Sequence, residues 1–427
     1  MSPAGTPTST SALDLATALF VQAECKRAVA ATALMRDHGV GIVYTLDPRR
    51  RRTRYKDALQ VITHTRERAP EGQILLDANL YSGRSRTIAG DKAAGPTRAW
   101  VDAQHRLGLS HALTDSGYVA AGNTAGLTAT LQAGADMGAN VLTALPLATR
   151  WLTHDADVLC ENVSRCGTPV AVMVENKDDP FDRKNAAAGL VELIATGVPV
   201  ALLRADTSAL GAIAHGAVAG AVGATSGLRH FYPIPDKDGG PDPTKDYLSF
   251  VIPDLLGYFS NERFLNAYDN DPANPAWRCG CCYCHGLPLT WINAAGQHDI
   301  PQAAPAPVGF DSLAELELAL PPIKEKPARG RDPRGDAAFQ HSVAAIAAFY
   351  AELTGIAQAT GASLASAWSL MCEHAQMQHF GVKTTDGKGW EPRPAFGRWR
   401  ELAATPVGLL PPASSPEREQ RGFPPSI

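Results

Sequence analysis

A cysteine cluster is the feature of this sequence with the clearest chemical meaning. Four of the chain's eight cysteines lie within residues 279–284, which read Cys-Gly-Cys-Cys-Tyr-Cys. One tight loop can direct the thiolates of Cys279, Cys281 and Cys284 at a tetrahedral zinc ion, with a fourth ligand from elsewhere in the chain. A redox-active pair or a chance cluster of small core residues is the alternative interpretation. The spacing predicts a metal site.

Polar residues at the ends of strand-like apolar runs form a second group with possible chemistry. Acids at several strand ends could supply the pair of carboxylates that acid–base or nucleophilic catalysis requires. Asp47, before Pro48, and Asp206, before Thr207, are equally typical of a turn and of a helix cap. The strand-end residues are Asp47, Asp77, Asn79, Asp115, Ser116, Glu175, Asn176, Arg204, Asp206, Thr225, Arg229, His230 and Asp254.

The elements that must position these residues alternate between short apolar runs and helical patterns. Eight strands alternating with helices predict an α/β protein with a (β/α)8 barrel, in which catalytic groups lie at the carboxyl ends of the strands. An open doubly wound sheet is the main rival, but no Gly-x-Gly-x-x-Gly motif follows the first run. The expected strands are 41–46, 73–78, 112–115, 140–145, 169–175, 199–206, 219–224 and 248–252, and helices are expected at 127–137, 184–195 and 210–215.

The rest of the chain is expected to be an appendage to the barrel. We expect the barrel over residues 13–265 and a zinc-binding, helical appendage over residues 266–405. Within the appendage, a Pro-rich stretch at 299–333 precedes helical patterns at 336–353 and 361–378. Residues 1–12 and the Pro-rich tail at 406–427 have the composition of loosely attached ends.

Composition and charge limit the environment and the partners. The other cysteines are scattered, the N-terminus lacks the pattern of a secretory signal, and no apolar run approaches 18 residues, so a cytoplasmic protein without a membrane association is expected. A formal charge of −4 provides no overall attraction to nucleic acid. The local exception is the basic run Arg49, Arg50, Arg51, Arg52, Arg54 and Lys56, which suits either a phosphate-binding patch or a solvated loop.

Two motifs resemble those of a known enzyme family. The segment Thr114-Asp115-Ser116-Gly117-Tyr118 is similar to the Asp-Ser-Gly-Gly-Phe segment of the tRNA-guanine transglycosylases, which are zinc-containing (β/α)8 barrels. Their zinc motif is Cys-x-Cys-x-x-Cys, followed by a histidine that opens a long helix. The cysteine cluster has this spacing, and His341 is the histidine best placed to complete it. His298, His285 and Cys282 are rival ligands, and the separation of His341 from the cysteines requires an insertion in the Pro-rich stretch.

The resemblance implies a function and roles for individual residues. It implies exchange of guanine or a deazaguanine at a glycosidic bond in tRNA or DNA, through a covalent intermediate formed by an aspartate. It makes the Zn2+ structural and allows a homodimer or heterodimer. By this resemblance the catalytic residues are Asp115, as the second carboxylate, and Asp254, as the nucleophile, and the substrate-binding residues are Ser116, Gly117, Glu175, Asn176, Arg229 and His230.

The sequence also departs from the family's pattern. The family's Asp-x-x-x-Pro-Thr-Arg segment, which carries the nucleophile, is absent, and residues 145–147 read Leu-Pro-Leu where the family has a base-reading aspartate. These departures favour a second hypothesis, a non-catalytic barrel that acts as a binding subunit. A third is an unrelated zinc-containing barrel hydrolase or lyase in which Arg229 and His230 bind an anionic substrate.

Overall fold

The computed structural model describes residue 13 and residues 15–50, 53–91, 95–234, 245–295 and 333–404. Several predictions therefore lie outside the described residues. They are the two chain ends, the Pro-rich stretch up to residue 332, the rival ligand His298, and Arg51 and Arg52 of the basic run.

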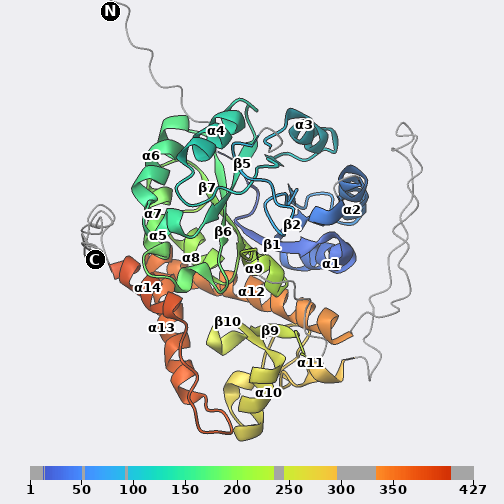
Figure 1. Ribbon diagram of the computed structural model, residues 1–427. Helices are drawn as coiled ribbons and strands as arrows, with labels where there is room; N and C mark the ends of the chain where they lie inside the picture. The colour runs from blue at the N-terminus through green and yellow to red at the C-terminus, as the bar shows by residue number, and fades with distance from the viewer. Residues whose placement is uncertain are drawn as a thin grey trace, which may run out of the picture.

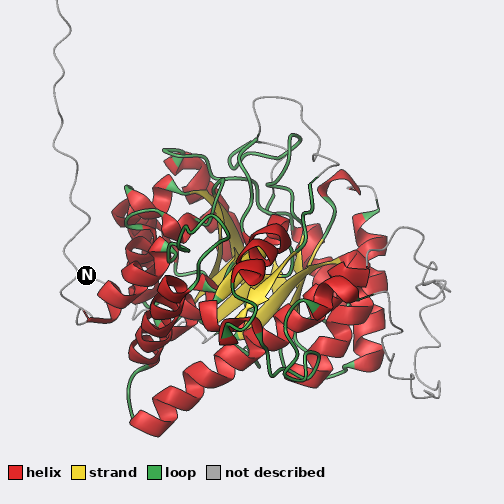
Figure 2. Ribbon diagram, turned by 90° about the horizontal axis from the view of Figure 1, so that it is seen from below, coloured by secondary structure: helices red, strands yellow, loops and turns green. Residues whose placement is uncertain are grey.

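Eight parallel strands form a nearly closed barrel, as the sequence predicts. Their hydrogen-bonded order is β3-β2-β1-β8-β7-β6-β5-β4, so β3 and β4 face each other across the one gap. The strands are Leu19–Glu24 (β1), Gly41–Thr45 (β2), Ile74–Asp77 (β3), Ala112–Leu113 (β4), Val141–Ala148 (β5), Val170–Glu175 (β6), Val200–Ala205 (β7) and Ala219–Gly223 (β8). Figure 2 shows these strands enclosed by helices, and side chains fill the barrel interior, so both faces of each strand are buried and most strand residues are apolar.

The gap between β3 and β4 is bridged by the loops that follow these strands. The Tyr118 amide donates to the Thr87 carbonyl at 2.8 Å, and the Ala89 amide donates to the Tyr118 carbonyl at 2.9 Å. On its other side this segment continues the pairing with β5, because the Val119 amide donates to the Pro146 carbonyl at 2.8 Å. Residues 116–119 therefore complete the barrel at its carboxyl end.

One predicted strand needs correction, and one strand of the barrel was not predicted. The run expected to be the eighth barrel strand, 248–252, is β9 (Ser249–Ile252), which pairs antiparallel with β10 (Gly257–Ser260) in a separate sheet. The place in the barrel belongs instead to β1, which the sequence reading missed and which pairs with both β2 and β8. A run of four to six apolar residues carries no information about which sheet it joins, and β1 follows an Ala- and Leu-rich segment that reads as helical.

Helices surround the barrel on the outside. Figure 1 shows them arranged around the strands. They are Ala28–His38 (α1), Arg54–Arg68 (α2), Arg98–Arg106 (α3), Thr124–Ala135 (α4), Arg150–Thr153 (α5), Ala156–Cys166 (α6), Ala186–Ala195 (α7), Ser208–Ala214 (α8) and Ser226–Arg229 (α9).

The appendage follows β8 and returns to the barrel through a long helix. Figure 1 shows β9, β10, α10 and α11 on the side of the barrel away from α3 and α4. Helix α12 packs on α1, β1 and β9, and so joins the barrel to the appendage. The helices are Asn261–Asn270 (α10), Trp291–Ala294 (α11), Pro333–Thr360 (α12), Leu364–Gly381 (α13) and Pro394–Ala404 (α14).

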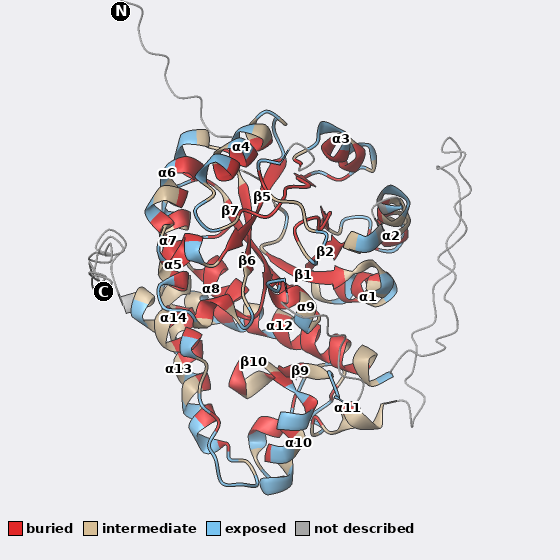
Figure 3. Cartoon of the chain, viewed as in Figure 1, coloured by how far each residue is buried: buried red, intermediate tan, exposed pale blue. Residues whose placement is uncertain are grey.

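Aromatic side chains form a separate small core within the appendage. Phe264 packs edge-on against both Phe250 and Trp277, and Trp390 stacks on Phe259 with ring centroids 4.8 Å apart. Helix α12 is long and apolar enough to cross a membrane by length and composition alone. Its buried residues, which include Phe339, Val343 and Ile346, are packed inside the molecule (Figure 3), and core helices meet the same criteria.

Candidate metal centre and barrel mouth

Three cysteines and one histidine meet beneath the barrel. The ligand atoms of Cys279, Cys281, Cys284 and His341 all lie within 4.8 Å of one another. The Cys284 sulfur is 3.1 Å from His341 Nδ1, and the Cys281 sulfur is 3.7 Å from the same nitrogen. Three thiolates and an imidazole are a donor set typical of tetrahedral zinc. The cluster can therefore hold a metal ion such as zinc, as the cysteine spacing predicts.

A tight loop directs the three thiols inward. The Cys284 amide donates to the Cys281 carbonyl at 3.0 Å, and the Gly286 amide donates to the Cys279 carbonyl at 3.0 Å. Gly286 has φ +79°, in the left-handed region that glycine tolerates without strain. The Trp291 indole N–H donates to the Cys284 sulfur at 3.2 Å, which fixes this thiol from the outside. Cys279 and Cys284 are buried as a result.

His341 is held in the orientation that a metal ligand needs. Its Nε2–H donates to the Val251 carbonyl at 2.7 Å, which directs Nδ1, the nitrogen that would bind a metal, at the thiols. Burial opposes protonation of this ring, but the adjacent Cys279 and Cys281 outweigh burial and raise the pKa of His341 to about 9. Because Val251 belongs to β9 and His341 to α12, the cluster ties the cysteine loop to both elements.

The two rival ligands that lie within the described residues, Cys282 and His285, take no part in this cluster. Cys282 is exposed, and its sulfur lies 3.9 Å from His38 Nε2, away from the three clustered thiols. His285 occupies a left-handed turn position with φ +51° and is exposed. The arrangement assigns each thiol of the Cys-x-Cys-x-x-Cys spacing to the site and leaves the extra thiol on the surface.

The carboxylate of Asp115 is fully engaged by its neighbours at the end of β4. The Thr97 amide donates to Asp115 Oδ1 at 2.7 Å, and the Thr97 hydroxyl donates to Oδ2 at 2.8 Å. Asp115 is 2% exposed. This carboxylate holds the start of α3 against the barrel, which is a structural task at the position where the resemblance implies a catalytic acid.

Ser116 and Gly117 also have structural tasks. The Ser116 hydroxyl lies 2.8 Å from the Thr114 hydroxyl, which in turn accepts the Ala144 amide. A Cβ atom at Gly117 would lie 2.9 Å from the carbonyl carbon of Ile88, closer than real Cβ atoms approach. Glycine is therefore required where this segment bridges the gap in the barrel.

Gly117→Ala is expected to lower the free energy of unfolding by about 1–3 kcal/mol, because overpacking must displace backbone atoms. Gly355→Ala is the matched control, since its Cβ would meet nothing within 4 Å on helix α12. There alanine is expected to stabilise by about 0.5–1 kcal/mol. Urea denaturation of both variants measures the difference, and equal stability of the two would show that the bridging segment relaxes freely.

Glu175 is the carboxylate that other side chains surround at the end of β6. It accepts from Arg86 and from the Tyr118 hydroxyl, and its side chain is 13% exposed. The Arg86 guanidinium lies 3.8 Å from the centre of the Tyr118 ring. Phe231, which is 0% exposed, packs edge-on against both Tyr118 and Tyr81. A planar cation, a carboxylate and aromatic rings therefore meet at the barrel mouth.

Arg86 was not among the predicted site residues. It lies in the loop after β3, where residues 83–87 read Gly-Arg-Ser-Arg-Thr, a composition typical of an exposed turn. Asn176 has a mainly structural position, because its amide donates to the Phe231 carbonyl at 3.1 Å and its side chain donates to the Asp179 carbonyl at 3.3 Å.

Several buried donors beside β7 and β8 have no hydrogen-bond partner. Arg229 Nη1, His230 Nε2 and the Tyr258 hydroxyl are buried and unpaired within the described structure. Arg229 lies over the Tyr258 ring at 3.9 Å, and its Nε is 4.0 Å from Asp206. Burial lowers the pKa of His230 to about 4, so its ring is neutral at pH 7. Unpaired buried polar atoms of this kind require a water molecule or a ligand, and Arg229 Nη1 can donate to an anion.

Asp206 and Asp179 join the C-terminal helix to the barrel. Arg393 Nη1 lies 3.0 Å from Asp206 Oδ2, and Arg393 also pairs with Asp179. All three side chains are 16% exposed or less. Burial raises the pKa of Asp179 to about 6, although Arg393 opposes the rise.

Deeper in the barrel, Asp77 is buried within a hydrogen-bond network. Tyr81, Gln22 and Thr45 donate to it at 2.8, 3.1 and 3.2 Å, and burial raises its pKa. Arg204 Nη1 donates to Asn79 Oδ1 at 2.8 Å beside this network. Its contacts cross-link β1, β2, β3 and β7 and stabilise the barrel interior.

Asp254 lies outside the barrel, whereas the sequence predicts it at the end of the eighth barrel strand. It belongs to the 3-10 turn Pro253–Leu255, which connects β9 to β10 in the appendage. Asp115, by contrast, follows β4 and contacts the start of α3, and Figure 1 places α3 on the opposite side of the barrel. The structure therefore does not bring the two predicted catalytic acids together.

Comparison with known proteins gives no family for this chain. No family model matches it. No curated protein matches it. Among solved structures, 3-hexulose-6-phosphate synthase from Salmonella typhimurium is similar with 14% sequence identity and a TM-score of 0.32, over 49% of this chain and 89% of that chain. A likeness this remote carries no information about activity, and (β/α)8 barrels as a class are often enzymes with diverse reactions.

The basic run is only partly described. Arg49 pairs with Asp47 at 2.8 Å and its side chain is 87% exposed. The pairing fits the turn and cap that Asp47 suggests in the sequence. Arg54 begins helix α2.

Proposed function

We propose that this protein is a transglycosylase-like enzyme that exchanges a purine-like base in tRNA or DNA. The observation that supports it most is the Cys3His cluster, in which a Cys-x-Cys-x-x-Cys loop after β8 meets a histidine near the start of a long helix. In this proposal the metal is structural zinc, because three thiolates and an imidazole fill its four positions. The Asp-Ser-Gly-Tyr segment at the end of β4 is the second supporting feature.

Glu175 is the residue that we assign to the attacking carboxylate. Both oxygens of Asp115 are held by Thr97, one of them by its backbone, and Asp254 lies in the appendage. Within the described residues, the Glu175 carboxylate is held only by the side chains of Arg86 and Tyr118. These side chains can move aside for a substrate. The rings of Tyr118 and Phe231 lie beside this carboxylate, and in this proposal they move apart so that a base can stack on them.

The proposed reaction conserves atoms and charge without another reactant. A Glu175 oxygen forms a bond to the sugar C1′ as the bond from C1′ to the outgoing base breaks. The incoming base then attacks C1′ and releases Glu175. The proton lost by the incoming base balances the proton gained by the outgoing base. The unpaired atoms Arg229 Nη1 and His230 Nε2 are left to contact the substrate.

A non-catalytic, base-binding barrel is the second candidate. The observation that favours it is Phe231, which is 0% exposed and packs between Tyr81 and Tyr118 across the mouth beside Glu175. In this alternative the nucleic acid or partner binds without any bond to C1′ being broken. The two candidates differ in whether labelled base enters the polymer.

Incorporation of labelled guanine and labelled 7-deazaguanine bases into total tRNA and duplex DNA tests the proposal. Wild-type protein is expected to label one polymer, and Glu175→Gln to reduce the rate at least about 1,000-fold, since an amide cannot form the ester intermediate. Glu161→Gln is the matched control, because Glu161 is exposed and pairs only with Arg165 on the surface of α6 among the described contacts. Full activity of Glu175→Gln would overturn the assignment, and label in neither polymer would favour the binding protein.

A further inference from the structure

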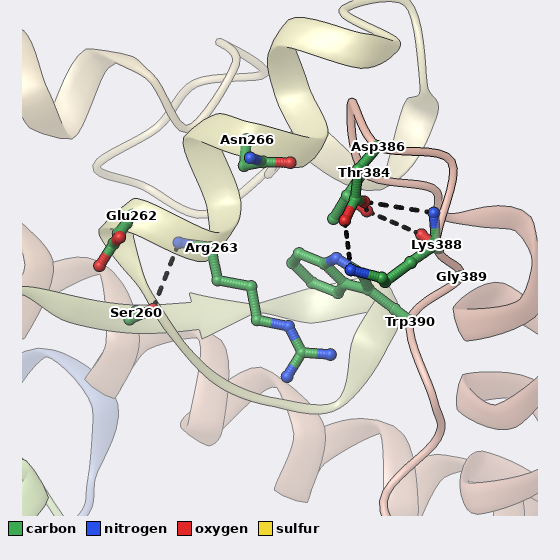
Figure 4. Close-up of a pocket in the computed structure, with 9 residues that line it drawn as sticks. All are labelled: Ser260, Glu262, Arg263, Asn266, Thr384, Asp386, Lys388, Gly389 and Trp390. Atoms are coloured by element: carbon green, nitrogen blue, oxygen red, sulfur yellow. Dashed lines mark hydrogen bonds and ion pairs between the residues drawn. The ribbon is translucent and has the colours of Figure 1, made fainter.

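A surface pocket in the appendage lies apart from both sites described above. It has a volume of about 390 Å3 and lies between the start of α10 and the loop that precedes α14 (Figure 4). Neither the metal cluster nor the barrel mouth contributes a residue to it. Its walls are Ser260, Glu262, Arg263 and Asn266 on one side and Thr384, Asp386, Lys388, Gly389 and Trp390 on the other.

The guanidinium of Arg263 lies in the pocket, and its N–H groups have no acceptor among the described residues. Its carbon Cζ lies 4.5 Å from the centre of the Trp390 ring. Figure 4 shows its side chain extending across the pocket toward the indole. Burial lowers the pKa of Arg263. Arg263 is nevertheless an exposed residue, and its unpaired N–H groups gain free energy when an anion accepts from its planar fork.

The surface under Arg263 is rigid. Trp390 is 2% exposed and stacks on Phe259 at 4.8 Å with 22° between the rings, and Arg263 lies 5.7 Å from that second ring. The backbone of Trp390 is fixed as well, because its amide donates to the Val382 carbonyl at 3.1 Å. The indole therefore holds the guanidinium in place, which reduces the entropy lost when a ligand binds.

The remaining charges leave room for an anion beside Arg263. The carboxylate of Asp386 is neutralised by Lys388 at 2.6 Å and accepts from the Thr384 hydroxyl. Figure 4 shows the Glu262 carboxylate directed away from Trp390, on the far side of the Arg263 backbone. The Asn266 side-chain oxygen accepts from Thr385 at 3.1 Å, so its NH2 group remains to donate. Donors from Arg263 and Asn266 thus remain for an anion in the pocket, and the Lys388 ammonium lies near them in its pair with Asp386.

We propose that this pocket binds a phosphate group of a nucleic-acid backbone. A phosphodiester presents two charged oxygens that match the guanidinium fork, and the exposed Lys388 ammonium can approach the same group. The site lies in the appendage, so it contacts the polymer at a distance from the base at the barrel mouth. It fixes the position of the polymer and carries no sequence preference of its own.

Fluorescence anisotropy with a labelled RNA hairpin and a labelled DNA duplex tests this site. Arg263→Met is expected to raise Kd about 5–10-fold. It is also expected to reduce the slope of log Kd against log salt concentration by about 1, since one fewer counterion is released on binding. Lys383→Gln is the matched control, because it removes a nearby surface charge that does not line the pocket. It is expected to change Kd less than about 2-fold. The RNA and DNA arms identify the polymer.

Each outcome decides the proposal. Equal Kd and equal salt slope for wild type and Arg263→Met would overturn it, and so would the absence of wild-type binding to either polymer. A circular dichroism melt confirms that Arg263→Met is folded, and Trp390→Phe, which keeps a ring under the guanidinium, is expected to weaken binding less than Arg263→Met. Failure of this phosphate site and failure of the proposed base exchange can be told apart. A protein without exchange activity can still show binding that depends on Arg263, and an active enzyme can lack that dependence.

Discussion

Cys281→Ser is expected to release the metal and to lower the melting temperature by at least about 5 °C. The serine hydroxyl is a poor zinc ligand at neutral pH, and loss of one ligand leaves two thiols and His341 facing one another without a cation between them. Because His341 lies on α12 and bonds to β9, the loss also loosens the appendage from the barrel. Metal analysis by mass spectrometry and a thermal melt measure the two effects.

Cys282→Ser is the control that makes this result specific. The two thiols are adjacent in sequence, but Cys282 is exposed and lies outside the cluster. Cys282→Ser is expected to retain zinc and to melt like the wild type. Retention of zinc and stability by Cys281→Ser would refute the assignment of the ligands.

Arg393→Met is expected to lower the free energy of unfolding by about 3–5 kcal/mol, because it leaves two buried carboxylates without their cation. Asp179 and Asp206 both pair with Arg393, and these side chains are almost completely covered. Arg400→Met is the matched control, on helix α14, which begins directly after Arg393. Arg400 pairs with Glu373 near the surface, where both side chains are more than a third exposed, so about 1 kcal/mol or less is expected.

The cost of Arg393→Met is also expected to depend on pH. Arg393 lowers the pKa of Asp179, which burial has already raised to about 6, so its removal raises that folded-state pKa further. A carboxyl whose folded-state pKa lies above its unfolded value is stabilising when protonated, and this stability is lost as pH rises through the folded pKa. The deficit of Arg393→Met should therefore be smaller at pH 5 than at pH 8 in urea denaturation. A deficit independent of pH would show that the carboxylates stay solvated.

The metal ligands could be predicted from sequence because a short loop determines them. The spacing of Cys279, Cys281 and Cys284 restricts the directions of their thiols, so local geometry alone specifies three ligands. His341 lies far along the chain and was found through the resemblance and through the helical pattern that follows it. Cys282 shows the limit of the argument, since only the fold decides which of two adjacent thiols points inward.

The strands were predictable as runs, but their partners were not. Runs such as 170–174 and 200–203 are apolar throughout because both faces of a barrel strand are buried, and charged residues appear only toward the carboxyl ends of these strands. Nothing local distinguishes β9, in the appendage, from β1, in the barrel, since pairing depends on contacts distant in sequence. Asp254 was assigned to the barrel mouth through the same error, because its role depended on the identity of the eighth strand.

The residues of the barrel mouth were the least predictable. Asp115 has the right position at a strand end, but its carboxylate is occupied by Thr97, a residue 18 positions earlier in the chain. Arg86 carries no sequence signal, and its contact with Glu175 joins loops separated by 89 positions. Sequence patterns indicate where polar groups gather, and the three-dimensional contacts determine which of them remain available to a substrate.

Zinc K-edge X-ray absorption of the purified protein tests the central claim most directly. The Cys3His centre predicts stoichiometric zinc with three sulfur scatterers at about 2.3 Å and one nitrogen at about 2.0–2.1 Å. That result would match three thiolates and one imidazole on one metal and support a structural role for it. Zinc coordinated by nitrogen and oxygen alone, or protein purified without a metal and unable to bind zinc when it is supplied, would contradict the account.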